Sequence, residues 1–168
     1  MSDLVYLSLG SNIGDREANL AGAITILGEY YENSDLRSAS FYNTQPLFNT
    51  DQPDFLNTVI ELKSTFTPFE FLDEIHKTEG LLGRPKDREK NQPRTIDIDI
   101  LTYGESVLET EQITIPHIGI PFRRFVLVPF CELAPNFMLP GWKKTVKEML
   151  ENCVDKSKVQ KQIIKSNA

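Results

Sequence analysis

The spacing of apolar residues changes in a regular order along the first half of the chain. Residues 4–9 form an apolar run that ends at a glycine, which indicates a buried strand. Asp15 then stands before apolar residues at helical spacing, which predicts an N-capped amphipathic helix to about Tyr31. Residues 36–42 and 55–64 are expected to form two further strands, joined by a loop that contains proline and asparagine.

Residues 67–70 carry a strong signal for the start of a second helix. Thr67 is a cap residue, Pro68 occupies the first helical position and Glu70 stands at the capping-box position. We expect Gly83 to end this helix, because glycine readily adopts the backbone conformation found just after helices. The stripe that the helix is expected to bury consists of Leu72, Ile75 and Leu82.

The second half of the chain adds one long strand and several shorter elements. High β-branched content predicts a strand over residues 95–103, and residues 104–122 are rich in turn signals. A short apolar piece covers residues 126–130, and a short helix is expected over residues 143–152. The order is therefore β-α-β-β-α-β with a C-terminal extension. This order indicates an α+β, ferredoxin-like sandwich, in which two helices pack on one face of an antiparallel sheet.

Length and composition are those of one globular domain. The 168 residues include 40% apolar and 25% charged residues, and no apolar run approaches the roughly 18 residues that would cross a bilayer. We expect the domain to cover residues 1–155, followed by a polar, mobile tail over residues 156–168. We expect the protein to be a monomer.

Charge and cysteine content narrow the possible functions. The net charge of −6 argues against a general nucleic-acid binder, so an anionic ligand would need a local basic patch or a metal ion. Cys131 and Cys153 lack metal-ligand spacing and are too few for a disulfide framework. The first residues include an acid and no basic segment, so they do not resemble a secretory signal. These features indicate a cytoplasmic protein without membrane association.

Two aspartates at alternate positions are the most informative feature. Asp97 and Asp99 fall on the strand expected over residues 95–103, so they share one face, with Cβ atoms about 7 Å apart at most. Carboxylates this close repel each other unless a cation lies between them, and Mg²⁺ typically joins one or two carboxylates to nucleotide phosphates. The alternative is a solvated strand face with two ordinary aspartates.

A basic segment, residues 84–94, leads directly into this strand. It could be a solvated charged loop, which is the commoner explanation of a charge run. Its position before the aspartate pair favours a mobile cationic lid for phosphoryl-type transfer, in which Arg94 is placed to bind phosphate through two hydrogen bonds. The basic residues of the segment are Arg84, Lys86, Arg88, Lys90 and Arg94.

Several polar side chains lie where a purely structural role would not require them. Glu79 falls on the apolar stripe of the second helix, near His76, and either faces a nucleotide or metal-bound water or pairs with a lysine at the core boundary. His117 lies close in sequence to Arg123 and Arg124. This segment could supply a second contact to phosphate, although a lone histidine is more often structural and the charge of Arg124 could equally be solvated.

Three further residues could form a pocket for a flat ring. Phe55 and Asn57 share a strand face, and Phe125 is a second candidate aromatic. An aromatic pair can hold a planar heterocycle, and an Asn amide can both donate to and accept from its edge. Taken alone, these residues are more typical of a core or a turn.

Together these residues resemble the 6-hydroxymethyl-7,8-dihydropterin pyrophosphokinase family, from Leu4 to about Pro140. The run Pro93-Arg94-Thr95-Ile96-Asp97-Ile98-Asp99 is the most specific motif. The weaker segments occur in the right order and spacing: Gly10-Ser11-Asn12, Phe41-Tyr42-x-Thr44-x-Pro46-Leu47, Asp51-Gln52-Pro53-Asp54-Phe55-Leu56-Asn57, Gly83-Arg84, and Pro116-His117 followed by Arg123.

The resemblance implies a ferredoxin-like fold and two Mg²⁺ ions bound together with ATP, with Asp97 and Asp99 as the metal ligands. The catalytic residues that it implies are Asp97, Asp99, Arg84 and Arg94. Contacts with ATP are implied for His76, Glu79, Arg84, Lys86, Arg94, Ile98, His117, Ile118 and Arg123. Contacts with the pterin are implied for Thr44, Pro46, Phe55, Asn57 and Phe125, with the two phenylalanines sandwiching the ring.

The implied reaction is attack of the pterin hydroxyl on the β-phosphorus of ATP, with AMP as leaving group. This sequence departs from the family pattern at Asn91, where tryptophan is frequent, at Gln92, which replaces a glycine, and at Lys86, where an arginine can occur. Two rival interpretations are a pterin-binding relative without catalysis and a ferredoxin-like RNA-binding sheet. The acidic charge argues against the second.

Overall fold

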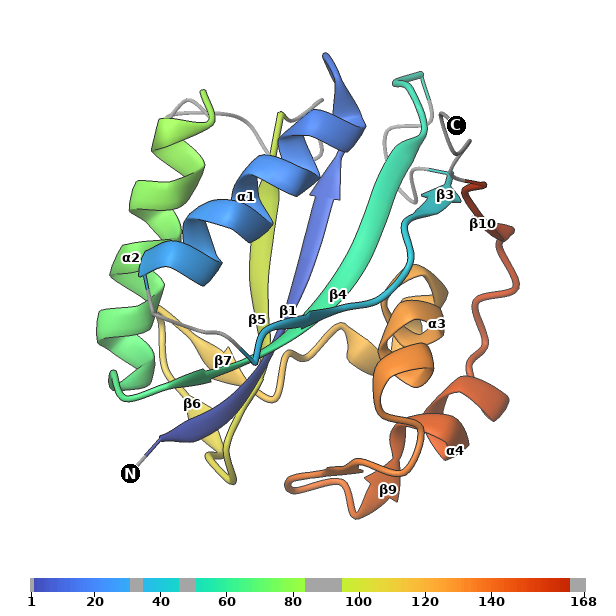
Figure 1. Ribbon diagram of the computed structural model, residues 1–168. Helices are drawn as coiled ribbons and strands as arrows, with labels where there is room; N and C mark the ends of the chain where they lie inside the picture. Colours follow the sequence, from blue (N-terminus) through green and yellow to red (C-terminus); the bar gives the residue numbers. More distant parts are fainter. Residues whose placement is uncertain (1, 31–34, 46–50, 84–94, 164–168) are drawn as a thin grey trace.

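The centre of the molecule is an antiparallel sheet. The computed structural model describes residues 2–30, 35–45, 51–83 and 95–163 (Figure 1). The strands of the sheet are β1 (Asp3–Ser11), β2 (Arg37–Ser38), β3 (Tyr42–Thr44), β4 (Phe55–Ser64), β5 (Asp97–Tyr103) and β10 (Val159–Lys161). Their order is β10–β3–β4–β1–β5, with β2 also paired to β4. This arrangement confirms the predicted α+β, ferredoxin-like fold.

Helices cover both faces of the sheet (Figure 1). The helices are α1 (Arg16–Tyr30), α2 (Pro68–Leu81), α3 (Arg124–Leu133) and α4 (Val146–Glu151). The remaining elements are β6 (Leu108–Glu109), β7 (Thr114–Ile115), the 3₁₀ turn η1 (Ile120–Phe122), β8 (Met138–Leu139) and β9 (Lys144–Thr145). The predicted pair, α1 and α2, packs on one face, and the C-terminal extension places α3 and α4 against the other, which we call the α3 face.

Alternation along the central strands creates a separate apolar cluster on each face. Leu7 and Leu9 of β1 are fully buried against α1 and α2, whereas Tyr6 points to the α3 face. There the Tyr6 ring lies 4.7 Å from the ring of Phe130 and 5.0 Å from that of Phe137, centroid to centroid. Burial of each large side chain contributes on the order of 2 kcal/mol. The α3 face is therefore a second core at this level of the sheet.

Helix signals in the sequence are confirmed where the caps were expected. Asp15 Oδ1 accepts a hydrogen bond from Ala18 N at 3.1 Å and so caps α1. Thr67 and Glu70 form the predicted capping box of α2, and Gly83 has a φ of 87° just after the helix end. The predicted stripe of α2 is partly wrong, because Leu72 and Leu82 are only partly buried. The residues of α2 that are buried are Phe71, Ile75, Thr78 and Glu79.

The strand expected over residues 36–42 is interrupted. It forms two short strands, β2 and β3, on either side of residues 39–41. The Thr58 hydroxyl donates to the carbonyl oxygens of Ala39 and Ser40, each at 3.1 Å. A side chain of β4 therefore hydrogen-bonds to the main chain between β2 and β3. Apolar spacing does not reveal such a break, because the interruption depends on the neighbouring strand.

Residues after 156 contribute a strand. Val159–Lys161 pair with Tyr42–Thr44 as β10, and the neighbouring Gln162 N donates to Phe41 O at 2.8 Å. The apolar piece expected over residues 126–130 is the middle of helix α3. Strand β10 and helix α3 thus both contact β3.

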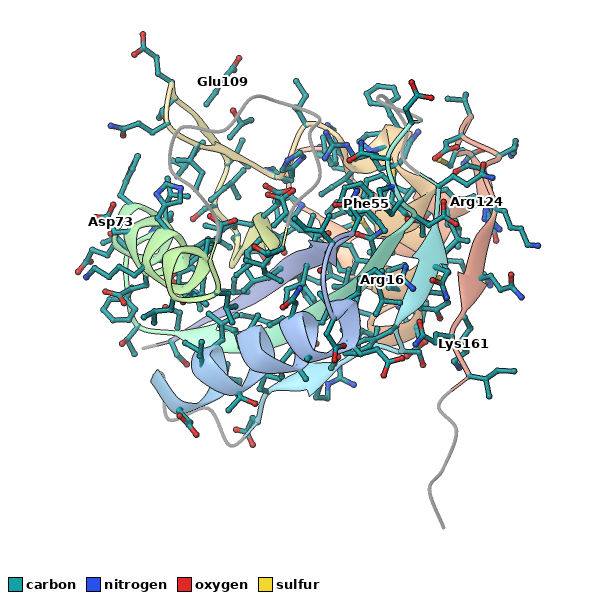
Figure 2. The ribbon with its side chains drawn as sticks, turned by 90° about the horizontal axis from the view of Figure 1, so that it is seen from above. Arg16, Phe55, Asp73, Glu109, Arg124 and Lys161 are labelled. Atoms are coloured by element: carbon teal, nitrogen blue, oxygen red, sulfur yellow. The ribbon has the colours of Figure 1, made fainter. Side chains whose placement is uncertain are left out.

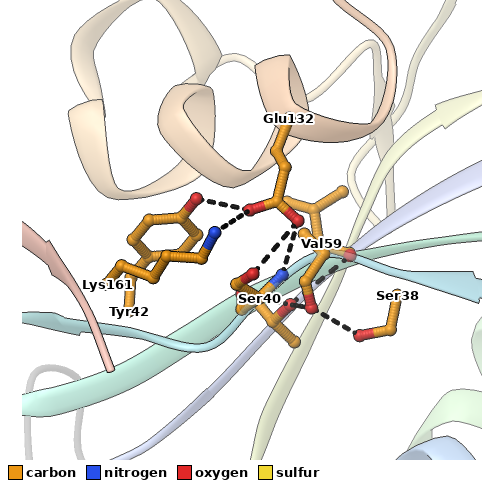
Figure 3. A network of polar contacts seen from close by, with 8 residues as sticks. Ser38, Ser40, Tyr42, Val59, Glu132 and Lys161 are labelled. Carbon is orange, nitrogen blue, oxygen red and sulfur yellow. Dashed lines mark hydrogen bonds and ion pairs between the residues drawn. The ribbon is translucent and has the colours of Figure 1, made fainter. Parts of the chain in front are cut away.

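Glu132 of α3 connects three separate parts of the chain (Figure 3). Its Oε1 accepts from the Tyr42 hydroxyl at 2.5 Å, and its Oε2 accepts from Ser40 N at 2.7 Å. Lys161 Nζ of β10 lies 4.0 Å from Oε1. Burial raises the pKa of Glu132, but the hydrogen bonds from Tyr42 and Ser40 and the charge of Lys161 outweigh burial and hold the pKa below its ordinary value.

We predict that Glu132→Gln lowers the free energy of unfolding at pH 7 by about 1 kcal/mol, because hydrogen bonds to a charged acceptor are replaced by weaker neutral ones. The side chain is 32% exposed, so solvent screens part of the effect. Because the folded-state pKa is depressed, this stabilisation is complete above the unfolded-state pKa and is lost as pH falls through the folded-state pKa.

The measurement is urea unfolding of both proteins between pH 7 and pH 3. The difference should shrink steadily below about pH 4.5, the ordinary range of a glutamate. Glu29→Gln, at an exposed position of α1, is the control. A difference that stays constant with pH would contradict this account of Glu132.

Candidate active site

The candidate residues meet at one end of the sheet, on the α3 face. Strand β1 pairs with both β4 and β5 as far as Gly10, which lies opposite Asn57 on one side and Asp97 on the other. Two residues earlier, Ser8 lies opposite Asp99. The aspartate pair and Asn57 are therefore held in rows across three strands, with only a glycine between Asp97 and Asn57.

Gly10 leaves room for the Asn57 amide. A Cβ atom at this position would lie 2.5 Å from Asn57 Oδ1 and 3.5 Å from the Phe55 ring. Asn57 Nδ2 donates to Thr44 Oγ1 at 2.6 Å, and both residues are almost completely buried, at 4% and 3% exposure. The amide is thus fixed in orientation by β3 and lies against the main chain of β1.

The segment before β4 is tied to the end of β1. Asn12 Nδ2 donates to Gln52 Oε1 at 2.8 Å and to Pro53 O at 3.1 Å. Arg16, at the start of α1, donates to Asp54 O at 3.1 Å. Figure 2 shows Phe55 and Arg16 near the centre of the molecule as seen from above. These contacts link the motif Gly10-Ser11-Asn12 to the motif over residues 51–57.

The aspartate strand is fixed by its opposite face and by α2. Ile98 and Ile100 point into the core under α1 and α2, so Asp97 and Asp99 point to the α3 face. Glu79 Oε2 accepts a hydrogen bond from Ile98 N, between the two aspartates, at 3.0 Å. Glu79 is only 6% exposed, and this contact with the main chain of β5 was not among the expected alternatives.

The donor set suits a hard divalent ion. Carboxylate oxygens are ligands that Mg²⁺ prefers, and this ion commonly takes one or two carboxylates and completes its shell with water and substrate phosphate. Within the described residues, no group of three or more His, Cys, Asp or Glu side chains forms a complete metal site. Asp97 and Asp99 therefore fit an ion that is shared with a phosphate-containing substrate.

His117 and Arg123 approach the aspartates from the segment between β7 and α3. His117 N donates to Leu101 O of β5 at 2.9 Å, which anchors this segment beside the aspartate strand. Gly119 N donates to His117 Nδ1 at 2.9 Å, so the neutral ring carries its proton on Nε2. The pKa of His117 is lowered to about 4, mainly by burial and also by the positive charge of Arg123, while the charge of Asp97 opposes the shift.

The other expected contacts differ in how the structure places them. Arg123 Cζ lies 5.9 Å from the centroid of the Phe125 ring, which packs partly against the α3-face cluster. His76 is exposed on α2, and Ile118 is 70% exposed. The Ile98 side chain points into the core, so a contact with a nucleotide would come from its main chain. The expected residues Arg84, Lys86, Arg94 and Pro46 lie outside the described residues.

Two site features escaped the sequence reasoning. The turn at Gly119 orders His117, and a glycine in a turn-rich segment carries no signal for that role. The contact between Glu79 and Ile98 N needs the spatial position of α2 beside β5. The Asn57–Thr44 hydrogen bond could have been inferred from strand pairing, because Thr44 and Asn57 both belong to the expected pterin set.

Comparison with known proteins agrees with this geometry. Residues 6–135 match the 7,8-dihydro-6-hydroxymethylpterin-pyrophosphokinase family. A Haemophilus influenzae 2-amino-4-hydroxy-6-hydroxymethyldihydropteridine pyrophosphokinase is 33% identical over 150 residues, which is 89% of this chain and 92% of that protein. The Bacillus subtilis enzyme of the same name is 39% identical over 133 residues, or 79% of each chain.

Solved structures show the same fold. The crystal structure of Plasmodium falciparum HPPK-DHPS A437G with STZ-DHP superposes with a TM-score of 0.70 at 14% identity. The superposition covers 90% of this chain and 45% of that longer chain. The chain therefore belongs to the 7,8-dihydro-6-hydroxymethylpterin-pyrophosphokinase family and is an enzyme of folate biosynthesis that uses ATP to pyrophosphorylate the hydroxymethyl group of the reduced pterin.

Proposed function

We propose that the α3 face of β1, β4 and β5 binds both substrates of this reaction, with two Mg²⁺ ions at Asp97 and Asp99 and the pterin at Phe55 and Asn57. We propose that the single-domain chain works as a cytoplasmic monomer. The observation that carries this proposal is the row Asp97–Gly10–Asn57 across three paired strands. In this row the proposed metal ligand Asp97 lies on one side of Gly10, and Asn57, which would recognise the heterocycle, lies on the other.

Each part of the pterin site has a defined chemical task. The Asn57 amide, oriented by Thr44, offers an acceptor and a donor to the edge of a pterin ring. Phe55 lies on the same strand face and supplies one aromatic wall, with Phe125 as the second wall and Pro46 as a further contact. The hydroxymethyl group then points along the row toward the aspartates, where the phosphates of ATP are held.

The nucleotide side combines positive charge with neutral donors. Asp97 and Asp99 would hold Mg²⁺, which would neutralise charge on the phosphate oxygens of ATP. His117 offers a neutral Nε2–H donor, and Arg123 offers a guanidinium that binds phosphate in a fixed geometry. The basic residues Arg84 and Arg94 would stabilise charge that develops as AMP leaves.

The pterin hydroxyl must also lose its proton when it attacks the β-phosphorus. Asp99 lies one row from Asp97, opposite Ser8, and could accept this proton, but ligation to a metal would make it a weak base. We therefore assign Asp99 first as a ligand and only second as a proton acceptor. His76, Glu79, Lys86, Ile98 and Ile118 complete the proposed contacts with ATP.

The α3 face differs from the open sheet surface of an RNA-binding module. In the row below the site, Tyr6 is packed against Phe130 of α3, so this part of the α3 face is a core and not a platform for bases. A direct test is to incubate the protein with MgATP and 6-hydroxymethyl-7,8-dihydropterin and to separate the products. AMP and the pterin diphosphate are expected. Pterin binding without AMP would identify an inactive relative.

We predict that Asp97→Asn and Asp99→Asn each lower kcat by more than about 100-fold, because losing a metal ligand should exceed the 10- to 100-fold cost of losing an outer-shell group. The fold should survive, since both side chains point away from the core under α1 and α2. Steady-state AMP release measures the effect. Asp73→Asn, at the exposed edge of α2 (Figure 2), is the matched control. Near-normal turnover in either site variant would contradict the metal assignment.

We predict that Gly10→Ala raises the KM for the pterin about tenfold, the effect of losing roughly one well-placed hydrogen bond. The added methyl group would displace the Asn57 amide, whose Oδ1 lies 2.5 Å from the position of the new Cβ atom. The KM for ATP should change much less. Gly28→Ala, where the new Cβ atom would lie 3.9 Å from the Leu36 side chain, controls for the substitution itself. An unchanged pterin KM would show that Asn57 does not recognise the ring.

We predict that the His117 imidazole stays neutral well below pH 6.5. Burial disfavours its charged form and lowers its pKa to about 4, so protonation should be detected only as the pH approaches that value. An NMR titration of the histidine ring protons between pH 7.5 and pH 4 measures this, and the spectrum of His117→Gln assigns the resonance. A midpoint near 6.5 would show that the ring is solvated and free to ionise.

A further inference from the structure

We propose that Gly119 is a positioning residue for the nucleotide side of the site: its missing side chain seats the Arg123 guanidinium, while its amide orients His117. This inference rests on the proposed role of Arg123 and His117 in binding ATP. It assigns a task to a residue that contacts neither substrate in that proposal.

The need for glycine at this position is spatial. A Cβ atom on Gly119 would lie 2.6 Å from Arg123 Nε, 2.9 Å from Cζ and 3.1 Å from Cδ. The backbone of Gly119 has φ −79° and ψ −11°, a helical conformation that any L-residue adopts without strain. A Cβ atom here would therefore not strain the backbone, but it would make the flexible end of the Arg123 side chain shift.

The same residue fixes the histidine. Gly119 N donates to His117 Nδ1 at 2.9 Å, and Ile120 N donates to His117 O at 3.1 Å, which closes a tight turn. The turn leaves Nε2 as the donor of the neutral ring. One residue thus controls the position of two neighbouring groups, one through its amide and one through the absence of a side chain.

Displacement of the guanidinium has a predictable size. Ordinary contacts of a Cβ atom begin near 3.4 Å, so the atom now 2.6 Å away would have to move by several tenths of an ångström or more. Arg123 also lies over the Phe125 ring, 5.9 Å from its centroid, so a shift of the guanidinium would disturb this stacking too. A displacement of about 1 Å in a positioning group can cost about 100-fold in rate.

The substitution Gly119→Ala separates the two tasks. It keeps the amide that donates to His117 and fills only the space that Arg123 uses. Gly80→Ala is the matched control, because a Cβ atom at that position of α2 meets nothing within 4 Å. The Arg123→Ala background completes the design, because it removes the side chain with which the new methyl group would collide.

The experiment measures kcat and KM for ATP and for the pterin in the wild type, Gly119→Ala, Gly80→Ala, Arg123→Ala and the Gly119→Ala/Arg123→Ala double variant. We expect Gly119→Ala to lower kcat/KM for ATP 10- to 100-fold and to change the pterin KM less than twofold. In the Arg123→Ala background, the same substitution should change kcat/KM for ATP less than twofold. An equal loss in both backgrounds, or a loss in Gly80→Ala of the same size, would overturn the proposal.

A second readout does not depend on turnover. The Arg123 Nε–H resonance, assigned by its loss in Arg123→Ala, should shift in Gly119→Ala and stay in place in Gly80→Ala. The histidine ring resonances should keep the Nε2–H tautomer in both. An unshifted Arg123 resonance in Gly119→Ala overturns the positioning role, whereas a wild type that releases no AMP contradicts the proposed function instead.

Discussion

The register of β1 between β4 and β5 is the constraint on which the site depends. Because β1 is hydrogen-bonded on both sides as far as Gly10, the positions of Asp97 and Asn57 relative to each other are set by main-chain pairing. A slip of one residue in either pair would turn the aspartates or the amide into the core under α1 and α2. The apolar side chains at alternate positions of β5 make such a slip costly, since isoleucines would then face the site.

The two faces of the sheet differ in how far helices cover them. One face is packed along its length by α1 and α2, whereas α3 packs on the other face near Tyr6 and Val59 and leaves the end with Asp97 and Asn57 to the site. The polar groups at this end are not loose. Asn57 is held by Thr44, β5 is held by Glu79, and His117 is held by its own turn. Such hydrogen bonds hold the ligand-binding groups in position before the ligand binds.

Much of the fold could be predicted because it depends on local patterns. The capping box at Thr67, the strand over residues 55–64 and the shared face of Asp97 and Asp99 all follow from spacing and side-chain type. The break between β2 and β3 could not be predicted, because it involves a hydroxyl from β4. Strand β10 was missed for a related reason: its three residues are partly or fully exposed, and only the edge of β3 makes them a strand.

The site shows the same limit. Alternation identified which strand residues share a face, and the family motifs supplied their expected partners, yet neither gives a contact between a helix and a strand end. Glu79 is an example, since its stripe position on α2 was recognised but its hydrogen bond to Ile98 N was not.

The pairing of strand β10 with β3 has a consequence for biosynthesis. Among the described elements β10 comes last in the chain, so during synthesis one edge of β3 keeps unpaired N–H and C=O groups until residues 159–161 have been made. The side of the sheet that orients Asn57 is therefore completed after the other described strands have been made, and until then the open edge of β3 can pair with another strand.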